Sequence, residues 1–289
     1  MAELRPSLLL IGHGSRSAAG VDAYWDFAAA LRTEAPGLDV GCGFIELARP
    51  DLEEAIDGLV AGGATSVVAV PLVLLGAGHL KNDGPAALAR ARTRHPAVHF
   101  TYARDLGIHP APLAVAADRI RSATAAWSSD RDPAAVVLVS RGSSDPDANA
   151  DLYKVARLLS DGSGPDLVEP AFVSLASPSV PDALERCRRL GATRVAVVPY
   201  FLFTGVLVER IRDQAAAWAG AHPGLEVTTG SEMGTDPRLV RLVMERYREA
   251  VDGDVRMNCD CCTYRVTLPG YEHRVGAPLV IGDHHHHHH

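Results

Sequence analysis

The chain has 289 residues, of which 47% are hydrophobic and 22% charged, and its formal net charge is −7. This composition is typical of a folded globular protein and excludes a disordered or fibrous chain. The sequence shows no apolar run of transmembrane length and no leader-type segment, so we expect no membrane partner and a cytoplasmic location. The negative net charge argues against a nucleic-acid partner, so an anionic ligand must be held by local basic side chains.

Short β-branched segments alternate with amphipathic segments, which is the pattern of a parallel sheet covered by helices. The first half predicts strands at residues 7–12, 39–46, 66–72 and 97–103. Helices are predicted at about residues 20–34, 50–62, 81–94 and 110–127. The second half predicts strands at residues 135–140, 167–174, 194–200 and 225–229. We therefore expect an α/β fold with doubly wound parallel sheets.

The second half of the sequence repeats the first at a constant offset of 128 residues. Phe44-Ile-Glu-Leu-Ala-Arg-Pro50, for example, returns as Phe172-Val-Ser-Leu-Ala-Ser-Pro178. We expect residues 1–130 to form a first half with the catalytic site, residues 131–253 a second half of the same topology, and residues 254–289 a cysteine-containing tail. Two such halves should face each other across a central cleft at the carboxyl ends of their strands, where ligands of such folds bind.

The two copies differ at three positions suited to chemistry. The first copy has His13, Glu46 and His79, where the second has Arg141, Ser174 and Leu207. We expect His13 to follow the first strand, Glu46 to end the second, and His79 to lie in the loop after the third, so that all three converge at the cleft. Two imidazoles and a carboxylate form a ligand set for cobalt, iron, nickel or zinc. The sequence therefore predicts one metal site, on the N-terminal half.

Three further histidines and two cysteines have structural explanations. His95 and His222 precede proline at nearly matching repeat positions, which indicates helix ends, and His109 before Pro110 is typical of a helix cap. Cys42 and Cys187 fall in predicted core positions.

Basic side chains near the predicted cleft are candidate partners for substrate carboxylates: Arg16, Lys81, Arg141 and Arg210. Arg141 is the strongest of these, because it replaces His13 in the second copy and should point into the same cleft. The apolar segments 71–76 and 199–204 either line the cleft as two walls for a large flat ligand or belong to the core.

Three motifs together resemble those of the sirohydrochlorin chelatases, the class II chelatases of the cobalt and siroheme pathways. They are Leu9-Leu-Ile-Gly-His-Gly-Ser-Arg16, Phe44-Ile-Glu-Leu-Ala-Arg-Pro50 and Val70-Pro-Leu-Val-Leu-Leu-Gly-Ala-Gly-His-Leu80. The resemblance covers about residues 5 to 250 and is closest to the long single-chain members. It implies the chelatase fold and the insertion of Co2+ or Fe2+ into the carboxylate-rich tetrapyrrole sirohydrochlorin, with release of two protons. It also implies that His13 and His79 bind the metal and catalyse the reaction, with Glu46 as their acidic partner.

The tail carries Met257-Asn-Cys-Asp-Cys-Cys262, which resembles an iron–sulfur-binding element of long cobalt-type chelatases. Its three thiols, Cys259, Cys261 and Cys262, are one fewer than a cubane cluster usually takes, so a zinc-binding or reactive tail is the alternative. The last six histidines are typical of a purification tag or of a natural histidine-rich end.

The sequence thus favours a sirohydrochlorin chelatase, with cobalt ahead of iron because of the cysteine tail. Nickel is chemically suited to the same ligands, since ligand type alone does not select among these ions. A non-enzymatic metal-storage protein or metallochaperone is the alternative, and it predicts tight metal binding without turnover. The sequence is also compatible with a homodimer.

Overall fold

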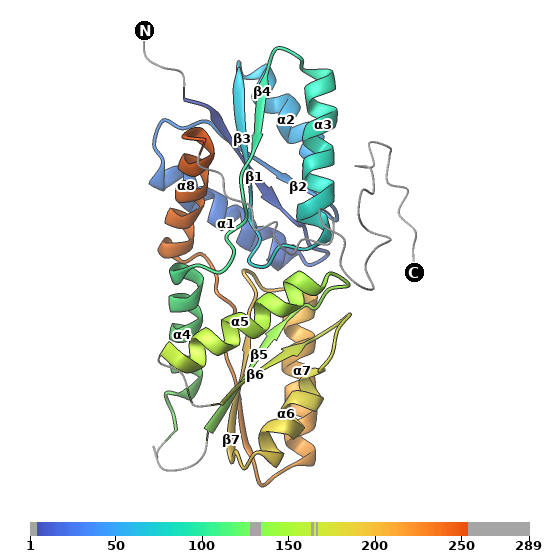
Figure 1. Ribbon diagram of the computed structural model, residues 1–289, viewed down its shortest axis with the longest axis vertical. Helices are drawn as coiled ribbons and strands as arrows, with labels where there is room; N and C mark the ends of the chain where they lie inside the picture. The colour runs from blue at the N-terminus through green and yellow to red at the C-terminus, as the bar shows by residue number, and fades with distance from the viewer. Residues whose placement is uncertain (1–4, 128–133, 163–164, 166, 254–289) are drawn as a thin grey trace.

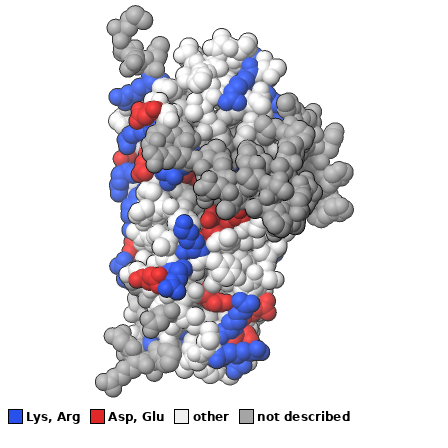
Figure 2. Space-filling view, viewed as in Figure 1, with Lys and Arg blue, Asp and Glu red and all other residues white. Residues whose placement is uncertain are grey.

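The computed structural model describes residues 5–127, 134–162, 165 and 167–253. No helix within these ranges is both long and apolar enough to cross a membrane. Figure 1 shows two α/β halves stacked along the long axis of the molecule. On the face seen in Figure 2, basic and acidic side chains are interleaved.

The N-terminal half contains a four-stranded parallel sheet with the strand order β2-β1-β3-β4. Its strands are β1 (Ser7–Gly12), β2 (Val40–Phe44), β3 (Ser66–Pro71) and β4 (His99–Tyr102). The helices that connect and follow them are α1 (Ala18–Glu34), α2 (Leu52–Ala61), the π-helical turn η1 (His79–Asp83), α3 (Gly84–Arg94) and α4 (Pro110–Thr124). All six residues of β1 are buried, as expected for a parallel strand covered on both faces.

The C-terminal half repeats this topology with the strand order β6-β5-β7-β8. Its elements are β5 (Ala134–Ser140), α5 (Pro146–Gly162), β6 (Leu167–Phe172), α6 (Val180–Arg189), β7 (Arg194–Pro199), α7 (Val206–Ala221), β8 (Glu226–Thr229) and α8 (Pro237–Val251). Local signals recur with the topology: Asp51 and Glu54 form a capping box at α2, and Ser179 and Asp182 form one at α6. The predicted fold class is confirmed.

The final helix of each half packs on the sheet of the other half. Helix α4 contacts β7, β8 and α5, whereas α8 contacts β3 and α1; Figure 1 shows α4 beside the lower sheet and α8 beside the upper one. Arg246 of α8, 2% exposed, donates hydrogen bonds to the carbonyl oxygens of Asp105 and Leu106. The predicted boundary near residue 130 follows the repeat in the sequence. In space, each half contributes its last helix to the sheet of the other half.

Several local expectations are confirmed and two need correction. His95 and His222 follow the last residues of α3 and α7, and the His109 side chain caps α4 by accepting a hydrogen bond from the backbone N–H of Ala111. Cys42 and Cys187 are buried. Strand β2, however, ends at Phe44, so Glu46 lies in the following loop. His79 does not lie in a loop: it begins η1, because a π-helical turn precedes α3.

The apolar segment after β3 is largely core, whereas most of the segment after β7 is half-buried. Leu72 and Leu74 are 4% and 7% exposed, and Tyr200 is 3% exposed. The ring of Phe203 packs against Phe27 of α1 with the ring centroids 5.9 Å apart. Phe203 of the second segment therefore packs against the N-terminal half, and the half-buried residues of both segments reach the surface.

Candidate functional site

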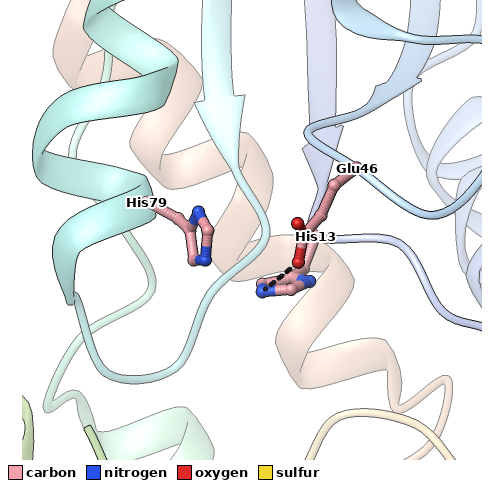
Figure 3. Close-up of side chains that lie close together, drawn as sticks. All are labelled: His13, Glu46 and His79. Carbon is pink, nitrogen blue, oxygen red and sulfur yellow. Dashed lines mark ion pairs between the residues drawn. The ribbon is translucent and has the colours of Figure 1, made fainter. Parts of the chain in front are cut away.

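His13, Glu46 and His79 meet at the carboxyl edge of the N-terminal sheet (Figure 3). Each offers one ligand atom, and these atoms all lie within 4.8 Å of one another. The Nε2 atom of His13 is 3.6 Å from Oε1 of Glu46, and the two imidazole rings meet edge to face with centroids 4.9 Å apart. This is the one cluster of three such residues with metal-ligand spacing in the described part of the chain. The structure thus brings together the three residues that the repeat singled out.

The strand order explains the convergence. The sheet order reverses between β1 and β3, so the loops that follow these two strands diverge to opposite faces and leave a crevice at their carboxyl ends. His13 follows β1 directly, and His79 begins the helical segment after β3. Glu46 comes from the loop after β2, which neighbours β1. Three residues far apart in the sequence are therefore placed at one point by the fold.

Gly14 allows close backbone contact between the loops that follow β1 and β2. The backbone N–H of Glu46 donates to the carbonyl oxygen of His13 at 3.1 Å. Gly14 has a φ of 96°, and a Cβ atom there would lie 1.7 Å from the carbonyl oxygen of Glu46. Gly142 and Ser174 repeat this arrangement in the C-terminal half, with a corresponding distance of 2.0 Å. Both halves hold the two loops together in the same way, but only the first carries the histidine and the carboxylate.

A half-buried tyrosine supports the π-helical turn that carries His79. Pro85 has no N–H group and cannot donate to the Leu80 carbonyl, which instead accepts a hydrogen bond of 3.0 Å from the Tyr102 hydroxyl. A Cβ atom on Gly84 would lie 2.2 Å from this hydroxyl oxygen. Gly84 therefore leaves space for the Tyr102 hydroxyl, and Pro85 leaves the Leu80 carbonyl oxygen without a backbone donor, which the Tyr102 hydroxyl replaces.

The environment of the two histidines shifts their pKa values in opposite directions. Burial lowers the pKa of His13, and the nearby His79 and Arg141 lower it further. Nδ1 of His79 donates a hydrogen bond to Oδ2 of Asp83 at 2.5 Å, and this bond raises the pKa of His79. His13 therefore presents a neutral imidazole near pH 7, suited to act as a ligand or a base. Asp83 orients the His79 ring with Nδ1 toward the carboxylate, as carboxylates do for metal-binding histidines.

Lys81 was expected to bind a substrate carboxylate, but it pairs with two aspartates of the other half. Its Nζ lies 2.8 Å from Oδ2 of Asp145 and 2.5 Å from Oδ2 of Asp147, and its side chain is 12% exposed. The ammonium group thus joins the turn that carries His79 to the start of α5 in the other half. A substrate carboxylate would have to displace two protein carboxylates to reach it, so Lys81 is not suited to be an anion partner.

The three arginines proposed as substrate partners are all exposed. Arg141 does point to the site, as its correspondence to His13 predicted: its NH1 atom lies 3.0 Å from Nε2 of His13. Arg16 lies in the loop between β1 and α1, and Arg210 on the second turn of α7. The structure shows no contact between either of these two and the three-residue cluster, so their role stays a prediction.

Sequence reasoning missed Asp83 and the pair Asp145 and Asp147. Asp83 could have been found from its i+4 spacing to His79, had a helical turn been assigned there instead of a loop. The two aspartates that hold Lys81 carry no such signal, because they are more than sixty residues away and belong to the other half. The predicted cluster ligands Cys259, Cys261 and Cys262 lie outside the described residues.

The fold and the site define an α/β protein of two similar halves, with a candidate metal-ligand cluster on the N-terminal half. The CbiX family model matches twice, over residues 7–123 and 135–250, one match for each half. The chain therefore belongs to the CbiX family.

Named relatives and solved structures agree with this assignment. The chain is 38% identical over 262 residues to a sirohydrochlorin cobaltochelatase from Priestia megaterium, which covers 91% of this chain and 85% of the relative. It is 28% identical over 246 residues to a sirohydrochlorin ferrochelatase from Bacillus subtilis, covering 85% of this chain and 92% of the relative. The structure of SirB from Bacillus subtilis with Fe3+ superposes with a TM-score of 0.75 at 28% identity, covering 88% of this chain and all of that one. The resemblance inferred from the three motifs is thus confirmed.

Proposed function

We propose that this chain is a sirohydrochlorin chelatase that inserts Co2+ or Fe2+ into the tetrapyrrole and releases two protons. The observation that carries the proposal is the cluster of His13, Glu46 and His79 at the switch point of the N-terminal sheet. The relatives named as cobalto- and ferrochelatases, and the SirB structures with Fe3+ and with cobalt, support the same activity.

The cluster suits delivery of a metal rather than its storage. Three protein ligands leave coordination positions open, as catalytic metal sites do and closed structural sites do not. Ligand atoms around a bound divalent ion lie about 3 to 4 Å apart, given bonds of about 2.1 Å. The spread of up to 4.8 Å here is slightly wider, so the side chains have to move inward to bind the ion. Such a site holds a metal loosely enough to pass it to a ring.

Insertion also requires bases for the protons of the ring nitrogens. His13, whose pKa burial and its cationic neighbours lower, is neutral near pH 7 and can accept a proton once the metal has left it for the ring. The Glu46 carboxylate, 3.6 Å from Nε2 of His13, stabilises the imidazolium that results. The same three residues can therefore present the metal and then take up one of the two protons, while the other passes to water.

We propose that exposed arginines hold the carboxylates of the substrate. A guanidinium pairs with a carboxylate through two parallel hydrogen bonds, which fixes the orientation of a carboxylate-rich ring. Arg141 stands at the site itself, and Arg16 and Arg210 remain the further candidates. The C-terminal half, which lacks the metal ligands, would thus contribute to binding the ring.

Cobalt is the proposed physiological metal, with iron second. The cobaltochelatase of Priestia megaterium is 38% identical to this chain, compared with 32% for the ferrochelatase of the same organism. Parallel initial rates with Co2+, Fe2+ and Ni2+ test this preference directly. A rate for Fe2+ or Ni2+ above that for Co2+ would overturn it.

The activity itself is tested by mixing the purified protein with sirohydrochlorin and Co2+ without oxygen and following the absorbance spectrum. We expect His13→Ala and His79→Ala to lower the rate at least about 100-fold, because each removes a ligand. His99→Ala is the matched control, since His99 is exposed at the start of β4 and should leave the rate unchanged. Wild-type rates in both site variants would place the chemistry elsewhere, and tight Co2+ binding without turnover would favour metal storage.

Three further features belong to the same proposal. A cytoplasmic location suits a biosynthetic enzyme of this kind, and homodimerisation is compatible with the sequence. An iron–sulfur cluster on Cys259, Cys261 and Cys262 is tested by deleting residues 255–289 and comparing colour, iron content and activity. Loss of iron with unchanged activity would make the cluster accessory.

A further inference from the structure

Arg141 contacts the atom of His13 that faces the metal site. The NH1 atom of Arg141 lies 3.0 Å from Nε2 of His13, and the same Nε2 lies 3.6 Å from Oε1 of Glu46. A guanidinium has only hydrogen-bond donors, so the imidazole nitrogen must be the acceptor. Its lone pair is therefore engaged by an N–H group of the other half of the protein.

This contact and metal binding at the same nitrogen exclude each other. A ring nitrogen has one lone pair in the plane of the imidazole, which serves either a hydrogen-bond donor or a metal ion. In addition, the guanidinium carries a permanent positive charge that repels a divalent cation at this short distance. As long as Arg141 stays in place, the cluster can offer Glu46 and His79 but not Nε2 of His13.

Arg141 can leave this position without disturbing the fold. Its side chain is exposed, whereas its backbone is fixed because its carbonyl oxygen accepts a 3.0 Å hydrogen bond from the N–H of Ser174. A carboxylate is a better partner for a guanidinium than a neutral imidazole, since the hydrogen bonds are then charge-assisted on both sides. A carboxylate-bearing ligand that arrives beside His13 would therefore attract the guanidinium away from it.

We propose that Arg141 blocks the metal-binding nitrogen of His13 in the free protein and releases it when a carboxylate of the tetrapyrrole takes the guanidinium. The metal site is then complete only after the ring is bound. Arg141 acts as a positioning residue through His13, in addition to holding the ring. The inference rests on the proposed function, because it takes His13 as a metal ligand and a carboxylate-rich ring as substrate.

The first test uses Co2+ alone, without tetrapyrrole, in a calorimetric titration at pH 7.5, with the six terminal histidines removed from every variant because they would bind Co2+ themselves. We expect Arg141→Gln to bind Co2+ about tenfold more tightly than the wild type, because the guanidinium and its positive charge are removed and the shorter side chain ends farther from His13. Arg189→Gln is the matched control: Arg189 is exposed, pairs with Glu185 on α6 and should bind Co2+ as the wild type does. The double variant His13→Ala/Arg141→Gln should lose the gain, which assigns it to His13.

The outcomes distinguish failure of the proposed Arg141 block from failure of the proposed metal site. Equal Co2+ affinity of Arg141→Gln and wild type, with weaker binding by His13→Ala, would overturn the block but leave the metal site intact. Unchanged Co2+ binding in both His13→Ala and His79→Ala would overturn the proposed site and the block with it.

Steady-state kinetics provide a second readout that a merely structural role would not produce. Arg141→Gln should raise the KM for sirohydrochlorin while it tightens Co2+ binding, because the residue serves the ring and opposes the metal. A general distortion of the site would weaken both. A variant in which Co2+ binding and the KM for the ring both worsen would contradict the proposal.

Discussion

His79 and Asp83 form a hydrogen-bonded pair within one π-helical turn, with Nδ1 of His79 2.5 Å from Oδ2 of Asp83. The carboxylate fixes the ring so that Nδ1 faces Asp83, and it raises the pKa of His79. Because the folded-state pKa is raised, the stabilisation from this pair is complete below the unfolded value of 6.5 and is lost as the pH rises through the folded value. Protons also compete with a metal for His79, so Co2+ affinity should rise with pH until that value is passed.

We predict that Asp83→Asn weakens Co2+ binding about 10- to 100-fold when compared above the folded-state pKa of His79, because the ring loses the partner that orients it. The pKa of His79, followed by NMR, should fall in the same variant. Asp57→Asn is the matched control, since Asp57 also pairs with a histidine, His95, at 2.7 Å but lies outside the site. Equal Co2+ affinity of the wild type and Asp83→Asn would show that Asp83 does not orient the ring.

We predict that Gly14→Ala both destabilises the protein and weakens metal binding. An added Cβ would meet the Glu46 carbonyl oxygen at 1.7 Å, so the loop that carries Glu46 must move. Gly63 isolates the effect of the clash: its φ of 97° matches the 96° of Gly14, but nothing lies within 4 Å of its added Cβ. Thermal unfolding should show a loss of about 1 to 2 kcal/mol for Gly63→Ala from backbone strain alone.

The loss for Gly14→Ala should exceed that for Gly63→Ala by at least about 2 kcal/mol, because the clash adds to the strain. Co2+ affinity should drop only in Gly14→Ala. Equal losses of stability in the two variants would mean that the two loops adjust freely to one another.

Lys81 joins the two halves through Asp145, which is only 1% exposed. We predict that Lys81→Met lowers the free energy of unfolding by about 3 kcal/mol, since it leaves a buried carboxylate without its cation. Urea unfolding measures this change, and Arg157→Met, which removes an exposed pair with Asp161, should leave the midpoint unchanged. Co2+ binding should weaken as well, because the turn that carries His79 loses its link to α5. A fully stable Lys81→Met would show that the ion pair only offsets its own desolvation.

The raised pKa of Asp105 makes the protein less stable as the pH rises, which is the opposite of the effect of a salt-bridged carboxylate. Burial, followed by repulsion from Asp151, raises the pKa of Asp105 from 3.8 to about 6. The folded state therefore binds the proton more tightly than the unfolded state, and stability falls as the pH rises from about 4 to about 6. The difference between the two values corresponds to at most about 3 kcal/mol.

Asp105→Asn should accordingly be more stable than the wild type at pH 7.5 and equal to it near pH 3.5. Thermal unfolding across this range tests the expectation, with Asp22→Asn, an exposed position on α1, as the control. A variant that is less stable than the wild type at pH 7.5 would show that the charged form of Asp105 is needed for the packing around it.

Most of the correct predictions about the fold and the candidate site came from the internal repeat. Strands and helices follow from the periodicity of apolar residues, and both copies had to adopt one topology, so errors stayed at the ends of elements. His13, Glu46 and His79 were identifiable because each differs from its counterpart in the second copy. His79 was placed wrongly in a loop, since its π-helical turn depends on Pro85, Gly84 and the distant Tyr102 hydroxyl.

The sequence by itself determined that this protein has two like halves and that one of them bears the three candidate metal ligands, because these properties follow from residue type and spacing. The tertiary structure decided the pairing of side chains from different halves. Lys81 pairs with Asp145, and Arg141 donates a hydrogen bond to His13. Helix α4 packs on the C-terminal sheet, and α8 packs on the N-terminal sheet. Such contacts join residues 64 or more positions apart, where only the packing of one half against the other brings the charges within reach.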